Sequence, residues 1–192
     1  ARMGYEMTGL DLSAGMLRAA GEKARRAGVR AQFVRQDMRA LTLGRRADAV
    51  LATCDGVNYL DSLKAAEEFF EAANAALKVG GLLLFDISSQ YKLENILGCN
   101  TFAEDEQGGA YIWKNNYDPK SRLIEMNLTF FERQGELYRR FTERHIQRAH
   151  GVDELLSALN RAGFDAEAYD FETMDPVKPD SERVQFSGRK RR

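Results

Sequence analysis

The stretch GYEMTGLDLSAGMLRAA, residues 4–20, contains the pattern on which the fold depends. Residues 5–10 have the composition of a short strand, and that strand ends at an acidic residue, Asp11. Ser13 has a side chain that commonly caps a helix, and Gly28 is a typical helix end. The apolar face of this helix is expected to consist of Met16, Leu17, Ala20 and Ala24. The stretch therefore predicts a strand that leads directly into a helix.

The same alternation continues through the first half of the chain. Further strands are predicted at 31–35, 48–53 and 82–85. The run 48–53 is almost entirely apolar, which is typical of a strand covered on both faces. A long helix is expected to begin after Ser62 and to end at Gly80 and Gly81, with a core face of Leu63, Ala66, Phe70, Ala73 and Leu77. Strands separated by helices indicate crossover connections and a parallel sheet.

The pattern changes after Ser89, where a short helix is predicted at 91–98. Three antiparallel strands are expected next, at 110–117, 122–132 and 136–147. The chain then returns to a helix at 152–162 and to two strands, near 165–172 and 182–188. We therefore predict a three-layer α/β fold in one domain over residues 1–192, with a mostly parallel sheet and an antiparallel last strand. The region 90–148 is predicted to be an inserted β meander.

The composition is that of a soluble globular protein, with 192 residues, 44% apolar and 30% charged. The formal net charge of −1 gives no general attraction to nucleic acid or to anionic membranes. The chain has no apolar run near the roughly 20 residues of a membrane span, and no signal peptide precedes the first strand. We therefore expect a cytoplasmic protein. The two cysteines, Cys54 and Cys99, indicate neither a disulfide framework nor a zinc site, so no metal is expected.

Acidic residues follow several of the predicted strands, and ligands of such sheets bind at the carboxyl ends of the strands. They are Asp11, Asp37, Asp55 and Asp86. Asp11 is placed to accept hydrogen bonds from both hydroxyls of a ribose, or else to interact favourably with the N-terminus of the following helix. Asp37 is placed to accept a hydrogen bond from the adenine amine, with the Met38 N–H donating to a ring nitrogen. The alternative for Asp37 is a solvated loop carboxylate.

Four stretches of the first half occur in a characteristic order: GLDLSAGMLRAA, FVRQDMRAL, ADAVLATCDGVNYL and ALKVGGLLLFDISS. Together, over residues 5–89, they resemble the class I, Rossmann-like methyltransferases that depend on S-adenosylmethionine (SAM). The meander, from YKLENILGCN to FTERHIQRAH, resembles a small bacterial subfamily of these enzymes. The resemblance implies SAM as cofactor, S-adenosylhomocysteine as product, and a methyl acceptor that is more readily a small molecule than a nucleic acid.

The resemblance also implies roles for individual residues. Asp11 would hold the ribose with Leu12 and Met16 beside it, and Asp37 and Met38 would contact the adenine.

The family commonly uses a backbone carbonyl at the position of Cys54 to bind the methionine amino group, so the thiol itself is expected to be inert. Asp55, Asn58 and Tyr59 follow at the mouth of the methyl-donor site, although Asn58 and Tyr59 equally fit a helix-entry turn.

Methyl transfer from a sulfonium needs mainly an acceptor held in line with the methyl group, and a general base only if the acceptor is protonated. His145 is a candidate base or acceptor-binding group, as is Tyr59. The alternative for His145 is a surface position beside Arg139, Arg140 and Arg144. Since the meander follows a strand end, we expect it to cover the carboxyl edge and to act as an acceptor lid.

The family has a strand and a glycine-rich loop before the region that here begins at Ala1. That strand is central, and its removal would leave backbone groups unpaired at about 1–3 kcal/mol each. We therefore expect about 40–50 further residues upstream, and weak or no cofactor binding without them.

Two other functions remain possible from the sequence. A nicotinamide-dependent oxidoreductase also uses an acid after the second strand, although the pair Asp37-Met38 and the CDGVNYL junction argue against it. A non-catalytic binding module would keep the fold without needing both Asp11 and Asp37.

Overall fold

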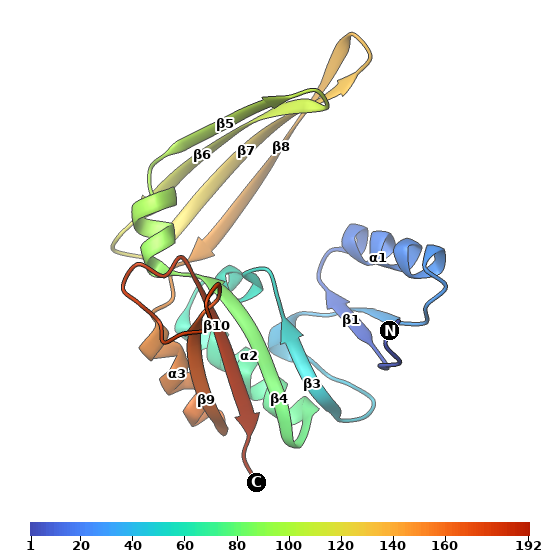
Figure 1. The fold of residues 1–192 in the computed structure, drawn as a ribbon, viewed down its shortest axis with the longest axis vertical. Coiled ribbons are helices and arrows are strands. Elements are labelled where there is room, and N and C mark those ends of the chain that lie inside the picture. Colours follow the sequence, from blue (N-terminus) through green and yellow to red (C-terminus); the bar gives the residue numbers. More distant parts are fainter.

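The computed structural model describes residues 1–192 and divides them among three sheets (Figure 1). A two-stranded parallel sheet contains β1 (Thr8–Asp11) and β2 (Gln32–Arg35). A four-stranded sheet has the order β3-β4-β10-β9, with bounds Ala47–Ala52, Leu77–Ser88, Arg183–Lys190 and Phe164–Asp170. The third sheet is the meander β5-β6-β7-β8, with bounds Thr101–Glu106, Gly109–Asp118, Leu123–Gln134 and Leu137–Arg148.

Helices connect these strands in the predicted places. They are α1 (Ala14–Arg26), α2 (Leu63–Ala76), α3 (Val152–Arg161), the short 3₁₀ turns η1 (Met38–Ala40) and η2 (Gly56–Tyr59), and the π-helical turn η3 (Lys92–Leu97). The crossover β3–α2–β4 joins two parallel strands, and β10 lies antiparallel to both β4 and β9. The predicted Rossmann-like α/β fold with an antiparallel last strand is confirmed.

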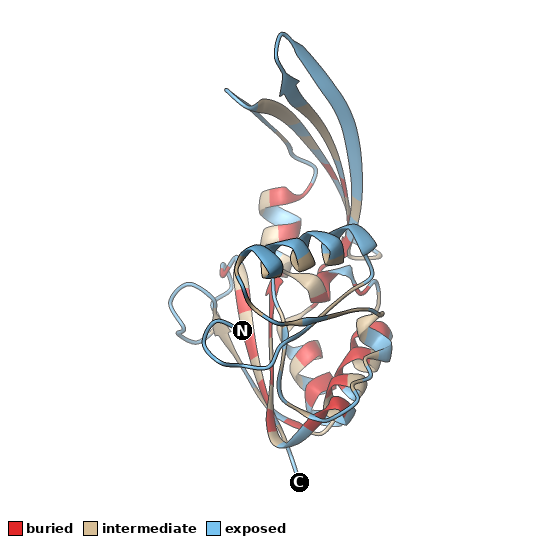
Figure 2. Ribbon diagram, turned by 90° about the vertical axis from the view of Figure 1, so that its right-hand side faces the viewer, coloured by how far each residue is buried: buried red, intermediate tan, exposed pale blue.

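The main core lies between α2, α3 and one face of the β3-β4-β10-β9 sheet. Its largest side chains include Phe69 and Phe70 of α2, Phe85 of β4 and Phe186 of β10. The rings of Phe85 and Phe186 stack with centroids 4.7 Å apart, which fixes β10 against β4. This part of the fold therefore provides a rigid support for the strand ends above it (Figure 2).

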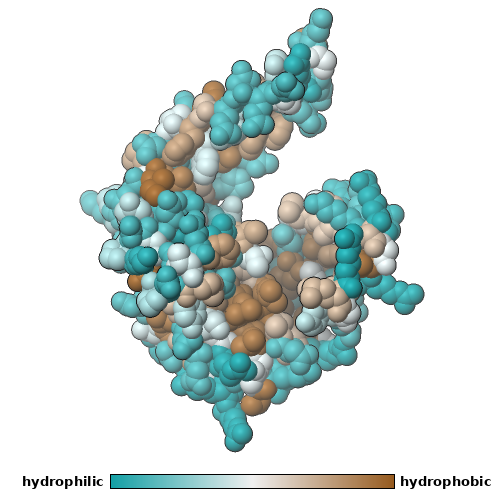
Figure 3. Space-filling model, viewed as in Figure 1, coloured by the Kyte–Doolittle hydropathy of each residue, from teal (hydrophilic) through white to brown (hydrophobic).

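Strands β1 and β3 are not paired with each other, so the sheet of β1 and β2 is separate from the sheet that contains β3. The prediction that β3 is covered on both faces is wrong for this structure, because Leu51 is 57% exposed. The physical reason is that only one face of β3, that of Val50 and Ala52, packs against the core, and Leu51 lies on the opposite, uncovered face. Figure 3 shows apolar surface around β3 in the middle of the molecule, between the two sheets.

Helix α1 begins as predicted, since the Ser13 hydroxyl accepts a hydrogen bond from the Met16 N–H at 3.2 Å. Its apolar face, however, is not buried, and Met16 is 63% exposed. The helix lies on the small β1-β2 sheet, which offers too little surface to cover it. Of the predicted apolar face, Leu17, Ala20 and Ala24 are half-buried and Met16 is exposed.

Helix α2 also begins as predicted, with the Ser62 hydroxyl accepting from the Ala65 N–H at 3.2 Å. It ends at Ala76, however, rather than at the two glycines. Gly80 and Gly81 instead lie within β4, where Gly80 has φ of +75°. A Cβ at Gly81 would lie 2.9 Å from the Lys78 carbonyl oxygen, so a side chain is excluded there. The glycines therefore form a tight turn at the start of the strand.

The meander has four strands, whereas the sequence predicts three. Strand β5 was missed because its sequence, TFAEDE, is acidic and mostly exposed, so it lacks an alternating pattern. A second apolar cluster fixes the base of this sheet against η3, and its buried members are Leu93, Leu97, Ile124, Met126 and Ala149. The meander rises above the carboxyl ends of β3 and β4 (Figure 1).

Candidate functional site

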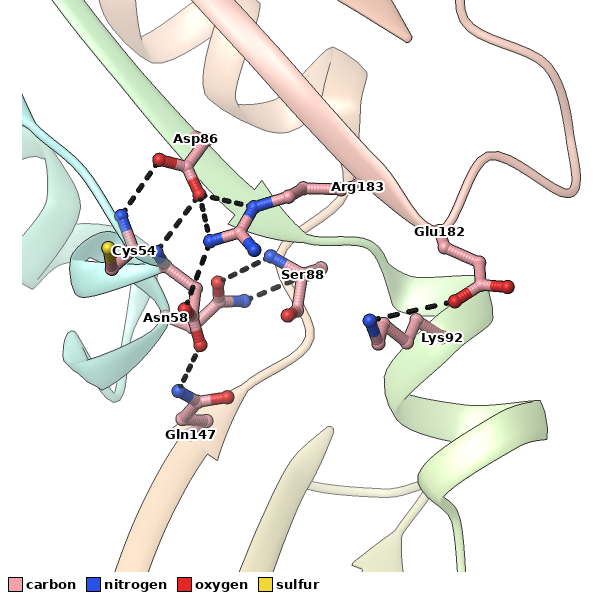
Figure 4. Close-up of polar contacts among 9 residues, drawn as sticks. Cys54, Asn58, Asp86, Ser88, Lys92, Gln147, Glu182 and Arg183 are labelled. Atoms are coloured by element: carbon pink, nitrogen blue, oxygen red, sulfur yellow. Dashed lines mark hydrogen bonds and ion pairs between the residues drawn. The ribbon is translucent and has the colours of Figure 1, made fainter. Parts of the chain in front are cut away.

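The chain turns sharply where β3 ends, at Cys54 and Asp55. Both residues have left-handed backbones, with φ of 60° and 50°. Such conformations are uncommon for residues with a side chain, although Asp adopts them more readily than most, and strained examples cluster at functional sites. Both backbone N–H groups donate to one carboxylate, that of Asp86, at 2.9 and 3.0 Å (Figure 4). Asp86 therefore stabilises the strained turn from the end of the neighbouring strand.

Asp86 is almost fully buried and is paired with Arg183 of β10. The Arg183 Nε and Nη2 atoms lie 2.7 and 2.6 Å from Asp86 Oδ2, and Nη2 is also 3.3 Å from Asp55 Oδ1 (Figure 4). The sequence marks Asp86 only as a strand-end acid. Arg183 was missed, because the pairing of β4 with the last strand is a tertiary contact across 97 residues.

A third element reaches the same turn from the meander. Gln147 of β8 is buried and donates from Nε2 to Asp55 Oδ2 at 2.7 Å (Figure 4). The Asp55 carboxylate is thereby fixed by Gln147 on one oxygen and by Arg183 on the other. Strands β3, β8 and β10 thus meet at one residue that the sequence assigns to the methyl-donor site.

Of the two expectations for Asn58, the structure fits the helix-entry turn rather than the mouth of a site, since the residue lies in η2 before α2. It is completely buried, and its amide nitrogen donates to the carbonyl oxygens of Ser88 and Arg148 at 3.0 and 2.9 Å. Its side-chain oxygen accepts from the Ser88 N–H at 2.9 Å. These three bonds join η2 to the ends of β4 and β8, so the side chain has a structural role.

Asp11 lies at the end of β1, as predicted. Its Oδ1 accepts from the Ser13 N–H at 2.8 Å, which leaves Oδ2 without a protein partner. The neighbouring apolar side chains Leu12 and Met16 are 59% and 63% exposed. A carboxylate oxygen available beside uncovered apolar surface fits a ligand that has both hydroxyl groups and an apolar face.

Asp37 follows β2 and begins η1. Its carboxylate accepts from the Arg39 N–H at 2.9 Å and forms an ion pair with the Arg39 guanidinium, with Nη2 2.6 Å from Oδ2. Hydrogen bonding from the Arg39 side chain holds the pKa of Asp37 below its usual value, so the group is ionised at neutral pH. Asp37 therefore already has a protein partner, which the sequence did not predict.

Met38 provides a connection between the two parts of the predicted site. It packs against the main core, and a Cβ at Gly56 would lie 3.8 Å from its Cε atom. The Met38 N–H is the first of η1, a position without a partner inside the helix. The residues after β2 and those after β3 are thus neighbours, although their strands belong to different sheets.

The two candidate proton-transfer residues, Tyr59 and His145, are in direct contact. The Tyr59 hydroxyl lies 3.0 Å from His145 Nδ1, and His145 Nε2 lies 3.2 Å from Glu143 Oε2. Partial burial, followed by the nearby charge of Asp55, raises the pKa of Tyr59 above its usual value. The phenol therefore keeps its proton at neutral pH. The sequence indicated each residue separately, but it gave no sign that they meet.

Cys54 and Cys99 are both exposed free thiols. The chain contains no cluster of three or more His, Cys, Asp or Glu side chains with the arrangement of a metal site. None of its helices combines the length and the apolar character needed to cross a membrane.

Comparison with known proteins identifies the family to which this chain belongs. Residues 1–81 match the family described as "Methyltransferase domain". Methyltransferase YqeM of Bacillus subtilis (strain 168) is 35% identical over 193 residues, which are 99% of this chain and 77% of that protein. The chain therefore belongs to the class I SAM-dependent methyltransferases, a result that disfavours the oxidoreductase alternative.

Solved structures agree with this assignment. A SAM-dependent methyltransferase from Clostridium acetobutylicum ATCC 824 superimposes with a TM-score of 0.93 and 30% identity, over 98% of this chain and 76% of that chain. The SAM-bound amino pentose methyltransferase CalS10 of Micromonospora echinaspora has a TM-score of 0.72 and 19% identity, over 96% of this chain and 74% of that chain. At that identity the second likeness shows the fold alone.

Proposed function

We propose that this protein transfers the methyl group of SAM to a small-molecule acceptor at the carboxyl ends of β1, β2 and β3. The observation that carries the proposal is the Cys54-Asp55 turn, which is strained and fixed by Asp86 at the strand end where this family binds its cofactor. A turn held so firmly presents the Cys54 carbonyl in one orientation, which suits a bound amino group.

The available side chains fit SAM at most of the predicted positions. Asp11 would hold the ribose hydroxyls through its unpaired oxygen, while Leu12 and Met16 would cover the apolar face of the nucleoside. The Met38 N–H would contact the adenine, and Asp37 would do so if Arg39 released one carboxylate oxygen. Asp55 completes the set, and we leave out Asn58 because its amide is already paired.

When bound, SAM supplies an activated methyl group, and the residues of this chain then need to orient the acceptor and exclude water. The meander is placed to do this, because His145 and Gln147 of β8 contact Tyr59 and Asp55 at the strand ends. We propose that residues 90–148 form the acceptor lid. The amino pentose substrate in the name of CalS10 is consistent with a small acceptor, although it belongs to that protein.

The charge pattern of the meander also favours a small molecule over a nucleic acid. Arg144 is paired with Glu125 at 2.7 Å, and Arg139 lies 3.9 Å from Glu132. Nucleic-acid surfaces use unpaired cations to replace counterions on phosphates, and these arginines are matched by neighbouring carboxylates. The predicted cytoplasmic location remains a prediction.

Calorimetry and thermal shift with S-adenosylhomocysteine and with NAD test the proposal. In the full-length protein we expect S-adenosylhomocysteine to bind and to raise the melting temperature, whereas NAD should leave it unchanged. Stabilisation by NAD alone would contradict the proposal.

A further inference from the structure

Three residues from two distant parts of the chain form a continuous line of hydrogen bonds. Tyr59 ends η2, directly above the end of β3, while Glu143 and His145 lie two residues apart on one face of β8. The Glu143 carboxylate can only accept, so the His145 Nε2 atom that faces it at 3.2 Å carries a proton. In the neutral ring the Nδ1 atom is then unprotonated and accepts from the Tyr59 hydroxyl at 3.0 Å.

We propose that Tyr59, His145 and Glu143 form a proton relay, and that the methyl acceptor accordingly carries an N–H or O–H group. This inference rests on the methyltransferase function proposed above. A carboxylate, a thiolate or a thioether acceptor has no proton to lose on methylation and would not need such a relay. An amine, which is protonated at neutral pH, or a hydroxyl does need one.

Proton transfer along the relay begins at the acceptor. Its N–H or O–H group donates to the Tyr59 oxygen, and the Tyr59 proton is directed at His145 Nδ1. As the acceptor forms its bond to the methyl carbon, the carbon–sulfur bond breaks and its electron pair stays on sulfur. The acceptor proton passes to the Tyr59 oxygen, and the Tyr59 proton passes to Nδ1. Glu143 then stabilises the imidazolium through Nε2–H, and solvent removes the proton later.

The acceptor lies at the Tyr59 end of the relay, because Tyr59 is more exposed to solvent than His145. Tyr59 is 49% exposed and follows the Cys54-Asp55 turn by four residues, whereas His145 is partly covered by its neighbours. Pairing in the meander places Leu128 opposite Glu143, and Phe130 opposite Phe141, on the same face as His145. The rings of Phe130 and Phe141 stack with centroids 5.0 Å apart. Beyond His145, the same face of the meander is therefore apolar and aromatic.

Few charged groups face the relay. Asp55 and Glu143 act on Tyr59, and Glu143 acts on His145. Gln147 is the next residue on this face and is neutral. Arg144 points to the opposite face of β8, where it is paired with Glu125.

Two variants prevent proton transfer along the relay and largely keep the shape of the side chains. Tyr59→Phe keeps the ring, and His145→Asn keeps an acceptor for the Tyr59 hydroxyl but cannot take up a proton at neutral pH. Glu143→Gln tests the positioning role of the carboxylate. The matched controls are Tyr138→Phe and Glu136→Gln, exposed residues at the far end of the meander with no contact to the relay.

The assay measures transfer of ³H-methyl from SAM to defined probe sets, namely primary amines, sugar alcohols, and the corresponding carboxylates and thioethers. Binding of S-adenosylhomocysteine is measured on the same samples. We expect transfer to amine or hydroxyl probes only, with kcat about 10²–10⁴-fold lower in Tyr59→Phe and His145→Asn. Glu143→Gln should lower it about tenfold, and the controls should match the wild type.

The split between kcat and KM separates a relay from a structural role. Tyr59→Phe and His145→Asn should lower kcat and leave KM and the affinity for S-adenosylhomocysteine unchanged, whereas a structural role would change all three.

Methylation of carboxylate or thioether probes at a rate unaffected by Tyr59→Phe would overturn the relay. Binding of S-adenosylhomocysteine without transfer to any N–H or O–H probe would also overturn the relay, but it would leave the cofactor proposal intact. Failure of S-adenosylhomocysteine to bind would instead contradict the proposed function itself.

Discussion

Asp86 and Arg183 form a two-bond ion pair across the neighbouring strands β4 and β10, with Nη2 2.6 Å and Nε 2.7 Å from one carboxylate oxygen. The carboxylate is nearly inaccessible to solvent, and it also accepts the N–H groups of Cys54 and Asp55. One buried charge thus fixes both the last strand of the sheet and the turn that begins the predicted methyl-donor site.

Arg183→Met should be strongly destabilising, because it leaves the Asp86 charge buried and unpaired. We expect the free energy of unfolding to fall by about 3–5 kcal/mol, measured by urea denaturation. The double variant Arg183→Met with Asp86→Asn should recover part of this loss. Arg189→Met, on the same strand but exposed, serves as control and should change stability by less than about 1 kcal/mol. A loss within that control range for Arg183→Met would contradict the prediction.

Asn58→Ala should destabilise the protein without any ligand present. It leaves two carbonyl oxygens and one N–H group of the core without their partner, and we expect a loss of about 2–4 kcal/mol. Asn58→Asp should be worse, because both of its oxygens are acceptors and the one that replaces the amide nitrogen would face two carbonyl oxygens. Asn116→Ala, an exposed residue of β6, should change the free energy of unfolding by at most about 0.5 kcal/mol. Equal stability of Asn58→Ala and this control would rule out the structural role.

Asp11→Asn should weaken binding of S-adenosylhomocysteine and leave the fold intact. The variant keeps the bond to the Ser13 N–H through its amide oxygen, but it loses the charge that would bind ribose hydroxyls. Since a hydrogen bond to a charged group contributes about 1.5–3 kcal/mol, the dissociation constant should rise about 10–100-fold in calorimetry. Asp105→Asn on β5 is the control. An unchanged affinity would mean that Asp11 does not bind the ribose and only interacts favourably with the N-terminus of α1.

His150 should make the protein less stable as the solution becomes more acidic. It is completely buried, its Nε2 donates to the Leu60 carbonyl at 2.9 Å, and its Nδ1 has no hydrogen-bond partner. Burial lowers the pKa of His150 below the usual 6.5, and the charge of Arg148 acts in the same direction. The unfolded chain therefore takes up a proton near pH 6.5 that the folded protein does not.

The stability contributed by neutral His150 is thus complete above about pH 6.5 and is lost as the pH falls toward 5, with a slope of at most about 1.4 kcal/mol per pH unit. His150→Gln can still donate to the Leu60 carbonyl but does not titrate. Urea denaturation from pH 5 to 8 should therefore show a smaller pH dependence in this variant. Parallel curves for both proteins would exclude His150 as the cause.

Local patterns predicted most of the fold. The order of strands and helices, the caps Ser13 and Ser62, and the acids at the strand ends all follow from neighbouring residues, and the structure confirms them. The prediction failed where burial depends on a distant neighbour. The sequence predicts Leu51 as a core residue, and it is exposed because β3 packs against the core through its other face only.

The site was predicted less completely than the fold, for the same reason. Asp11, Asp37 and Asp55 could be identified because each follows its own strand. Gln147 and Arg183 fix Asp55 from 92 and 128 residues away, and no local signal marks them. The contact of Tyr59 with His145 spans 86 residues, so the two candidates could be named but not joined.

The unpaired edges of β1 and β3 have a consequence for cooperativity. Along the chain the first buried residue is Val57, so the β1–α1–β2 unit has no interior of its own. Such units open locally at a low free energy, and amide hydrogen exchange should be fast throughout α1. A ligand that touched both Asp11 and the Cys54 carbonyl would fasten this unit to the rest of the protein. At a concentration one hundred times its Kd it would add about 2.7 kcal/mol to the closed form, so that cofactor binding would also be a folding step.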